Sequence, residues 1–449
     1  MCYDFRADGR NGPANVKAKI KLRKGAGMFS YNSKFKFSFC MRCGIMCAVK
    51  NQGKEGVDML ISRTAECFLG KTAQEMPVVT VYGPRQSGKT TLVRHVFKDF
   101  AYANLENPTV RELAVHDPEA FFRQYPAPAI IDEVQRVPDL LSYIQVKVDE
   151  SGKCGQYILT GSHQPILRAK VSQSLAGRTS ILTLLPLSLV ELSESGKELS
   201  MEQAIVKGFL PRVHASRISA TDIYEDYYRT YVERDVRQLV EVENQTAFET
   251  FIRLLAGRVG QVVNFESLAG DVGVSAPTLR KWLSVLEASY VVFRLHPYYE
   301  NFGKRLVKSP KVYFTDVGLA AHLLRIRKED QVLRDPLVGG LFENLVVSEA
   351  LKWKYNAHHI EDFYFFRDNN GLEVDLVMEQ ARRLHLMEIK SSMTPDRSQA
   401  KNLRRLGAVA PVLSSTVVYR GEDFPIADGG EFVNFSRLSS CLDKLTGIK

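Results

Sequence analysis

The chain has 449 residues, of which 45% are apolar and 25% charged, a composition typical of a soluble globular protein with roughly two to four domains. The longest apolar run, 181–192, is interrupted by Thr183, Pro186 and Ser188, so no segment approaches the roughly 18 residues of a membrane span. We therefore expect no contact with membranes. Residues 1–58 hold 12 Lys or Arg against four acidic residues and account for most of the net charge of +9. The nearly neutral remainder gives no indication that the whole fold binds nucleic acid.

The seven cysteines form an odd and unevenly spaced set, which argues against a disulfide framework and predicts a reducing compartment, the cytoplasm. Cys40, Cys43 and Cys47 form a C-x2-C-x3-C pattern that would suit zinc or an iron–sulfur cluster. No fourth ligand follows at a standard spacing, so the alternative is that these thiols hold no metal. The surrounding residues 1–58 are rich in Lys, Gly, Asn and Ser and are predicted to form a disordered arm, with Met59 as an alternative start.

Residues 59–215 have the pattern of a parallel α/β sheet. Short apolar runs at 78–81, 129–131 and 157–159 are separated by stretches with helical spacing, and polar residues follow each run. The carboxyl ends of parallel strands meet at one edge of a sheet, so these polar residues are expected to gather there. We predict a three-layer α/β domain.

The first of these strands leads into Gly83–Thr90, which matches G-x-x-x-x-G-K-[ST], the phosphate-binding P-loop. The glycines let the backbone curl until its amide groups face the phosphates, and a helix that starts at Lys89 adds the positive end of its dipole. Lys89 is expected to reach the β- and γ-phosphate oxygens, and Thr90 to supply a hydroxyl to Mg²⁺. The predicted nucleotide-binding residues are Gly83, Pro84, Arg85, Gln86, Ser87, Gly88, Lys89, Thr90 and Thr91. The predicted ligands are ATP and Mg²⁺.

Polar residues at the ends of the second and third strands are predicted to perform hydrolysis. Asp132 is expected to hold Mg²⁺, and the adjacent Glu133 to polarise a water for attack on the γ-phosphate. Ser162 is expected to contact the γ-phosphate or that water. Arg178 is the first candidate for stabilising charge in the transition state, and Arg168 is the second. The alternatives are ordinary surface carboxylates and surface ion pairs.

Residues 216–300 are predicted to form a helical lid with a winged helix-turn-helix. Phe265–Asp271 and Ser275–Leu286 have helical spacing, a tight turn at 272–274 separates them, and Ser275 is a natural N-cap. The outward-facing candidates for contact with DNA are Thr278, Arg280 and Lys281. The alternative is a lid that packs against the ATPase or binds a partner protein.

Residues 301–449 return to strands flanked by helices. Tyr364–Met378 predicts a hairpin with a turn at Asn370–Gly371. The period of two in a strand places Glu373 and Asp375 on one face. The residues expected on the opposite face are Val374, Leu376 and Met378.

A second constellation in this region is similar to the core of metal-dependent nucleases. Asp375 is followed by Glu388-x-Lys390 on the next strand, and in such nucleases two acids hold Mg²⁺ while a lysine orients or deprotonates the attacking water. Glu343, on the preceding helix, would complete the site. The alternative is a nuclease-like fold that serves structure or recognition without cleavage.

Taken together, the motifs resemble the bacterial and archaeal AAA-type ATPases that carry an uncharacterised C-terminal domain. The segments that carry the resemblance are Gly83–Thr90, Ile131–Gln135, Leu159–Ser162, Leu175–Arg178, Leu185–Ser188, Tyr313–Leu319, Phe342–Asn344, Glu373–Asp375 and Glu388–Lys390. The resemblance covers about residues 60–400. It implies phosphate contact for Lys89 and metal contact for Thr90 and Asp132. It further implies that Glu133 is the catalytic base.

The sequence therefore predicts an α/β protein with a parallel three-layer P-loop domain (59–215), a helical lid with a winged helix (216–300) and a restriction-endonuclease-like α/β domain (301–449). We expect an Mg²⁺-dependent ATPase whose nucleotide state controls the later modules. The alternatives are an ATP-gated DNA endonuclease and a non-enzymatic, nucleotide-dependent switch. The expected partners are ATP, DNA or a partner protein, and further copies of the chain.

Overall fold

The computed structural model describes residues 60–162, 171, 173–236, 244–298, 309–426 and 430–447, together with the backbone of 35–39 and 46–50. Contacts divide the chain into two units, 1–56 and 57–449. In the first unit, β1 (Phe35–Phe39) and β2 (Met46–Lys50) form an antiparallel pair, which the prediction of a disordered arm did not include. The rest of that prediction concerns residues outside the described part, among them Cys40 and Cys43.

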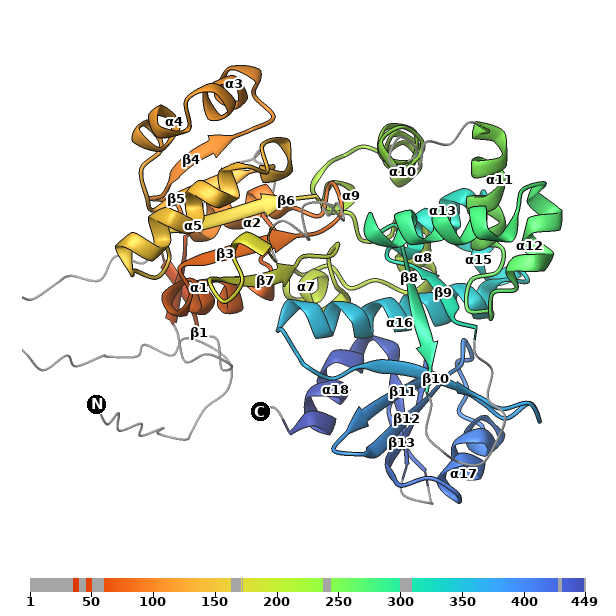
Figure 1. Cartoon of the computed structure of the whole chain (residues 1–449). Helices are drawn as coiled ribbons and strands as arrows, with labels where there is room; N and C mark the ends of the chain where they lie inside the picture. The colour runs from red at the N-terminus through yellow and green to blue at the C-terminus, as the bar shows by residue number, and fades with distance from the viewer. Residues whose placement is uncertain are drawn as a thin grey trace, which may run out of the picture. The chain divides into compact units, whose positions relative to one another are not determined.

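The five-stranded sheet of the second unit is parallel throughout, with the strand order β4-β5-β6-β3-β7 (Figure 1). Its strands are β3 (Val78–Tyr82), β4 (Ala101–Asn104), β5 (Ala129–Asp132), β6 (Tyr157–Gly161) and β7 (Thr179–Thr183). β3, β5 and β6 are buried along their whole length, which explains why their sequences are continuous apolar runs rather than alternating ones. Because β3 and β5 run in the same direction, the P-loop after β3 and Asp132 at the end of β5 lie at the same edge.

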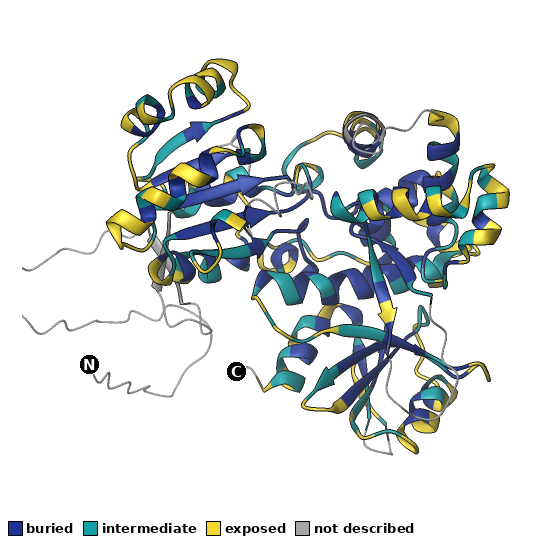
Figure 2. Ribbon diagram, in the orientation of Figure 1, coloured by how far each residue is buried: buried dark blue, intermediate teal, exposed yellow. Residues whose placement is uncertain are grey.

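Helices cover both faces of this sheet. On one face, α1 (Ala65–Glu75) and α2 (Lys89–Val96) pack through Leu69 and Val93 against the strands. On the other, the cover is α5 (Leu140–Ser151) with α3 (Pro108–His116) and α4 (Pro118–Gln124). Figure 2 shows buried strands between helices whose outer surfaces are exposed. The predicted three-layer α/β domain with a parallel sheet is confirmed.

Helices follow the five-stranded sheet along the chain. They are α7 (Leu189–Glu194), α8 (Met201–Lys207), α9 (Pro211–Ala215), α10 (Ala220–Tyr227), the π-helix η2 (Tyr228–Val236) and α11 (Gln245–Ala256). Ser188 and Ser200 start α7 and α8 with capping boxes, in which side chains satisfy backbone amides that have no partner inside the helix. η2 continues α10 directly, and π-helical turns are rare and frequently found at functional sites.

The predicted helix-turn-helix is present as α12 (Phe265–Val272) and α13 (Ala276–Ala288). Gly273 ends α12 in the left-handed region, at φ 79°. Ser275 caps α13 by accepting a hydrogen bond from the Thr278 amide. The apolar side of α13 is buried as expected, at Leu279, Trp282, Leu283 and Leu286.

The last sheet has eight strands in the order β14-β15-β13-β12-β11-β10-β8-β9. These are β8 (Val292–Pro297), β9 (Lys311–Phe314), β10 (Phe363–Arg367), β11 (Glu373–Gln380), β12 (Arg383–Ile389), β13 (Val412–Tyr419), β14 (Phe424–Pro425) and β15 (Glu431–Asn434). β8 precedes the predicted boundary at residue 300 yet pairs with β10, so this sheet joins the two predicted modules. The remaining helices are α14 (Val317–Leu323), α15 (Glu329–Arg334), α16 (Val338–Asn356), α17 (Lys401–Gly407) and α18 (Leu438–Thr446). Within the described residues, no helix has both the length and the apolar character needed to cross a lipid bilayer.

Candidate functional site

The P-loop joins β3 to α2 and requires glycine at two positions. A Cβ atom on Gly83 would lie 2.1 Å from the Leu184 carbonyl oxygen, so no larger residue fits there. Gly88 caps α2 with a φ of 90°, which other residues rarely adopt. The loop therefore turns sharply and ends at the N-terminus of a helix, where free amide groups favour an anion.

Lys89, the first residue of α2, is buried with only 5% of its surface exposed. Its Nζ donates hydrogen bonds to the carbonyl oxygens of Gly83 (3.0 Å) and Pro84 (2.8 Å). Burial lowers the pKa of Lys89 to about 8, since the opposing effect of the Glu133 and Asp132 charges is incomplete. Carbonyl dipoles alone do not compensate a buried ammonium, and phosphate oxygens would.

Asp132 is buried at the end of β5 and collects hydroxyl groups from three neighbouring elements. Thr90 Oγ1 donates to its Oδ1 (3.1 Å) and Oδ2 (3.0 Å), and Tyr102 Oη donates to Oδ2 (2.7 Å). Thr160 Oγ1 also donates to Asp132. A carboxylate beside a threonine hydroxyl is a donor set that suits Mg²⁺, so the predicted metal residues fit the ion. Sequence reasoning missed Tyr102, whose short strand carries no motif.

Glu133 adopts the left-handed region at φ 60°, a conformation that costs free energy for any residue other than glycine. Its amide donates to Thr160 Oγ1 (3.2 Å). The side-chain amide of Gln135 donates to the Glu133 carboxylate and also to Ser162 Oγ (2.9 Å). Gln135 thus joins the predicted base to the predicted Ser162. It lies inside a motif segment, but sequence reasoning gave it no role.

The structure does not bring Arg178, the first candidate for stabilising charge in the transition state, to the P-loop of its own chain, and its role in hydrolysis stays a prediction. Arg178 immediately precedes β7, and the first residue of β7 pairs with Val78 at the start of β3, whereas the P-loop follows the end of β3. Roughly 13 Å of strand therefore separates Arg178 from the phosphate site. Its guanidinium forms two hydrogen bonds with Asp149, at 2.6 and 2.8 Å, in an exposed position. The second candidate, Arg168, lies outside the described residues.

A different arginine, Arg63, forms a hydrogen bond with the backbone of the P-loop. It is buried, and its Nη1 donates to the Ser87 carbonyl oxygen in the loop (2.7 Å). Its Nε pairs with Glu191 (3.1 Å), and its Nη2 donates to the Leu185 carbonyl oxygen (2.7 Å). Arg63 precedes the first helix of the domain in a segment without a recognisable pattern, so no sequence signal identified it.

In the C-terminal domain, the structure brings together the four residues of the predicted nuclease site, Glu343, Asp375, Glu388 and Lys390. A further lysine, Lys311, lies among them. We call Glu343, Glu373, Asp375 and Glu388 the acidic cluster. Lys311 Nζ lies 2.9 Å from Glu343, 2.7 Å from Glu373 and 3.8 Å from Asp375. The oxygen atoms that contact Lys311 are Glu343 Oε1, Glu373 Oε1 and Asp375 Oδ1.

The predicted Lys390 contacts the acidic cluster. Its Nζ lies 2.8 Å from Glu388 Oε1 and 3.6 Å from Asp375 Oδ2. Burial raises the pKa of Glu388, and the charge of Asp375 raises it further. The ammonium groups of Lys311 and Lys390 therefore compensate part of the negative charge of the acidic cluster. Among the residues that the structure describes, no group of three or more His, Cys, Asp or Glu side chains is suited to hold a metal ion.

The expected alternation along β11 is interrupted by a β-bulge. Two steps along β10, from Tyr364 to Phe366, face three steps along β11, from Val377 to Val374. The extra residue places Val374 in the core beside α17, whereas Leu376 and Met378 pack in the core beside α16. The prediction that these three apolar residues share one face is wrong.

The predicted DNA-contacting residues lie on α13 with different surroundings. Arg280 is paired with Glu266 (3.0 Å) and its guanidinium lies over the Phe265 ring, 4.7 Å from the centroid. Thr278 Oγ1 shares a hydrogen bond with Ser275 Oγ, and Lys281 is exposed. DNA contact through these side chains stays a prediction.

Three family models match consecutive stretches of the chain. They are an AAA domain at 75–193, a domain of unknown function (DUF8612) at 198–330 and a second domain of unknown function (DUF4143) at 338–438. The AAA match contains the P-loop, Asp132, Glu133 and Ser162. The predicted AAA-type P-loop ATPase domain is confirmed. The matches to the later stretches confirm neither a winged helix nor a nuclease.

The chain is 32% identical over 378 residues to the uncharacterized protein Rv2008c of Mycobacterium tuberculosis, which covers 82% of this chain and 83% of that protein. The uncharacterized protein Mb2031c of Mycobacterium bovis matches to the same extent. The chain belongs to the family of these two proteins. A shorter match, 31% identical over 131 residues, links this Rv2008c family to the uncharacterized protein MJ1637 of Methanocaldococcus jannaschii, covering 28% of this chain and 27% of that protein.

Solved structures resemble this member of the Rv2008c family only distantly. The walker-type ATPase paby2304 of Pyrococcus abyssi has a TM-score of 0.38 at 13% identity, covering 59% of this chain and 96% of that one. AMPPCP-bound DnaA from Aquifex aeolicus has a TM-score of 0.26 at 13% identity, covering 49% and 86%. At such low TM-scores the relationship to ATPases rests on the sequence matches.

Proposed function

We propose that the protein is an Mg²⁺-dependent ATPase. The observation that carries the proposal is the placement of Asp132 and Glu133 beside the P-loop. Asp132 accepts a hydrogen bond from Thr90, the residue after Lys89, while Glu133 is held next to Ser162 by Gln135. A site that only binds phosphate needs the loop and its lysine. A site that hydrolyses ATP needs, in addition, a second acid beside the metal-binding one.

Each residue of the site has a distinct role in this mechanism. The loop amides and Lys89 bind the β- and γ-phosphates, and the phosphate charge keeps Lys89 protonated. Thr90 and Asp132 would hold Mg²⁺, which when bound neutralises charge on the phosphates. Glu133 orients a water toward the γ-phosphate and accepts its proton. Gln135 positions the carboxylate of Glu133.

We further propose that the nucleotide state is transmitted to the C-terminal domain through a buried polar relay. The relay begins where Arg63 contacts the carbonyl oxygen of Ser87 in the P-loop and pairs with Glu191. The Glu191 carboxylate also accepts a hydrogen bond from Asn356 at the end of α16 (3.5 Å). α16 is the helix that carries Glu343 and packs on the eight-stranded sheet.

A second connection between the two regions runs through Glu349, also on α16. Its Oε2 accepts a hydrogen bond from the Leu189 amide at the start of α7 (2.8 Å). Its Oε1 pairs with Lys352 Nζ (2.7 Å), which lies 3.6 Å from the centroid of the Phe209 ring. All of these groups are buried, so movement of the P-loop strains them unless α16 moves as well.

The hydrolysis proposal is tested by measuring ATP turnover with and without Mg²⁺. We expect Mg²⁺-stimulated turnover in the parent protein and a decrease of roughly 100-fold or more in Glu133→Gln, with nucleotide affinity retained. Glu150→Gln, an exposed glutamate on α5, is the matched control and is expected to keep parental turnover. Tight ATP binding without turnover in the parent would instead favour the non-enzymatic switch.

The relay is tested by hydrogen exchange of α16 with and without a non-hydrolysable ATP analogue. We expect the analogue to change the protection of α16 in the parent and not in Glu349→Gln, in which the pair with Lys352 is broken. Glu329→Gln on the exposed start of α15 serves as the control. An identical response in parent and Glu349→Gln would contradict transmission through this residue.

The geometry favours a structural role for the acidic cluster over the predicted ATP-gated endonuclease. Lys311 is buried between Glu343, Glu373 and Asp375, in the space that a metal ion shared by these carboxylates would need. A plasmid assay with Mg²⁺ or Mn²⁺ tests this choice. Cleavage by the parent that disappears in Asp375→Ala would restore the endonuclease.

A further inference from the structure

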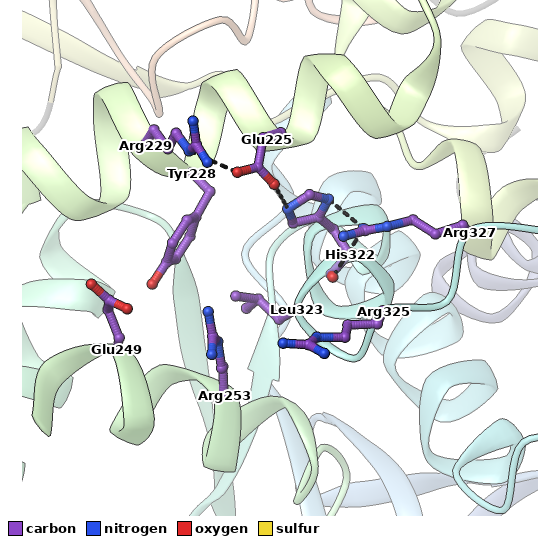
Figure 3. A pocket seen from close by; sticks show the side chains of 9 residues that line it. All are labelled: Glu225, Tyr228, Arg229, Glu249, Arg253, His322, Leu323, Arg325 and Arg327. Atoms are coloured by element: carbon purple, nitrogen blue, oxygen red, sulfur yellow. Dashed lines mark hydrogen bonds and ion pairs between the residues drawn. The ribbon is translucent and has the colours of Figure 1, made fainter. Parts of the chain in front are cut away.

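A pocket of about 290 Å³ lies between α10, η2, α11 and the end of α14, and none of its lining residues belongs to the predicted nucleotide site (Figure 3). We call it the arginine pocket, because its lining includes Arg229, Arg253, Arg325 and Arg327. Two glutamates, Glu225 and Glu249, also line it. Four guanidinium groups face two carboxylates, so the arginine pocket carries excess positive charge.

Two of the four arginines are already engaged by a chain of polar contacts. Arg229 Nε pairs with Glu225 (2.7 Å), and the other oxygen of Glu225 lies 3.3 Å from Nε2 of His322. Arg327 Nη1 donates to His322 Nδ1 (2.6 Å) and to the His322 carbonyl oxygen (3.0 Å). An arginine only donates, so His322 Nδ1 is the acceptor, and the neutral ring presents Nε2–H to Glu225. This chain holds one wall of the pocket rigid.

The other two arginines are not engaged. Arg253 on α11 and Arg325 after α14 both extend into the part of the pocket next to Leu323 in Figure 3. Within the part of the chain that the structure describes, neither guanidinium forms an ion pair or a hydrogen bond. Glu249 is nearby, but its carboxylate accepts a hydrogen bond from Gln245 (2.9 Å). Both side chains are exposed and therefore solvated by water, and an anion bound between these two like charges would reduce their mutual repulsion.

The backbone of Arg325 provides a second, independent observation. Arg325 has a φ of 61° and follows the C-cap of α14, the position at which helices usually place glycine. Its amide donates to the His322 carbonyl oxygen, and the next amide, of Ile326, donates to Ala321. Glycine would adopt this turn without strain, so the fold does not require an arginine there. Strained residues cluster at functional sites, where the side chain justifies the cost.

We propose that the arginine pocket binds the phosphate groups of a small phosphorylated ligand, with Arg253 and Arg325 as its principal contacts. Guanidinium groups form paired, charge-assisted hydrogen bonds with phosphate oxygens. The volume lies at the lower limit of small-molecule pockets, which suits one phosphate or diphosphate group rather than a whole nucleotide. The side chains predicted to contact DNA are on α13, and none of them lines this pocket.

Pyrophosphate is the probe, titrated by calorimetry into the full chain with Lys89→Ala present throughout to weaken binding at the P-loop. We expect one binding event that Arg253→Gln and Arg325→Gly each weaken about tenfold or more. Arg334→Gln, which removes an exposed arginine from the end of α15, is the control and is expected to leave affinity unchanged. Arg325→Gly relieves backbone strain, so its melting temperature should not fall, which separates lost binding from lost folding.

Two results would overturn the proposal. The first is pyrophosphate binding of equal strength in the control and in the Arg253→Gln, Arg325→Gly double variant. The second concerns a labelled DNA duplex followed by fluorescence anisotropy. If the parent binds the duplex through these two arginines and shows no binding of pyrophosphate, the pocket belongs to a nucleic-acid surface instead.

Discussion

Lys89 in the P-loop and Lys311 in the acidic cluster are both buried, with 5% and 1% of their surfaces exposed. Burial lowers the pKa of Lys89 to about 8, because its direct hydrogen-bond partners are two neutral carbonyl groups. Burial also tends to lower the pKa of Lys311, but the charges of Glu343, Asp375 and Glu373 outweigh it and raise the pKa above its usual range. A buried lysine therefore indicates a ligand site only where the protein leaves its charge uncompensated.

Substitution of Lys89 should have the largest effect, and that effect should be on the rate of ATP turnover. Lys89→Met should decrease ATP turnover roughly 100-fold or more, since the side chain is one of the charges that phosphate binding needs. The free energy of unfolding without nucleotide should change by only about 1 kcal/mol, because the loss of two hydrogen bonds to carbonyl oxygens is largely offset by the removal of an ammonium group whose burial is costly. Turnover and urea denaturation of parent and variant measure the two quantities. Equal turnover in both proteins would remove Lys89 from the mechanism.

Lys311 should behave in the opposite way. Lys311→Met leaves buried carboxylates without their partner, and the free energy of unfolding should fall by about 3–5 kcal/mol. Adding Glu343→Gln removes one of the stranded charges and should restore more than about 1 kcal/mol, measured as a double-mutant cycle. Lys401→Met, at an exposed lysine of α17, is the control and should have little effect. A stable Lys311→Met protein would show that the cluster does not depend on this charge.

The structure brings together the segments of the predicted nucleotide site, and the sequence could locate these segments because each of them is local. The continuous apolar run before Gly83 and the carboxylates that close the run at 129–131 are each read from a few neighbouring residues, and the parallel sheet brings them together. Arg178 lies away from the P-loop of its own chain for a topological reason, since a residue that precedes a parallel strand lies at the edge opposite the P-loop. The position of Arg178 just before β7, not its residue type, keeps it away from the P-loop.

The acidic cluster was predicted less well because its meaning depends on contacts between distant segments. Glu343, Asp375 and Glu388 were found from their spacing, but Lys311 belongs to β9 and reads in sequence as an ordinary strand residue. A β-bulge in β11 further broke the expected alternation, and such an extra residue leaves no clear sequence pattern. The arginine pocket is assembled from three segments without a motif, so no sequence signal could have located it.

The pH dependence of ATP affinity should provide a smaller difference between Lys89 and Lys311. The phosphates of ATP favour charged Lys89, whose pKa in the free protein is about 8. Below that pH the lysine is already protonated and affinity should be constant. Above it binding must take up a proton, so the dissociation constant should rise by up to about tenfold per pH unit. Calorimetry at pH 7 and pH 9 measures this change, and Lys89→Ala should bind weakly but show no such slope.

The smallest effect is expected from Glu388, the member of the acidic cluster that pairs with Lys390. Burial and the charge of Asp375 raise the pKa of Glu388 in the folded protein, and one buried oxygen of its carboxylate has no hydrogen-bond partner among the residues that the structure describes. The folded state therefore holds a proton that the unfolded state has released once the pH exceeds the ordinary value of about 4.3. Its contribution to stability is present in acid and is lost as the pH rises through the raised pKa. Glu388→Gln cannot lose a proton, so denaturation at pH 5 and pH 8 should show a smaller loss of stability in this variant than in the parent, and an equal loss would mean that Glu388 is already ionised at pH 5.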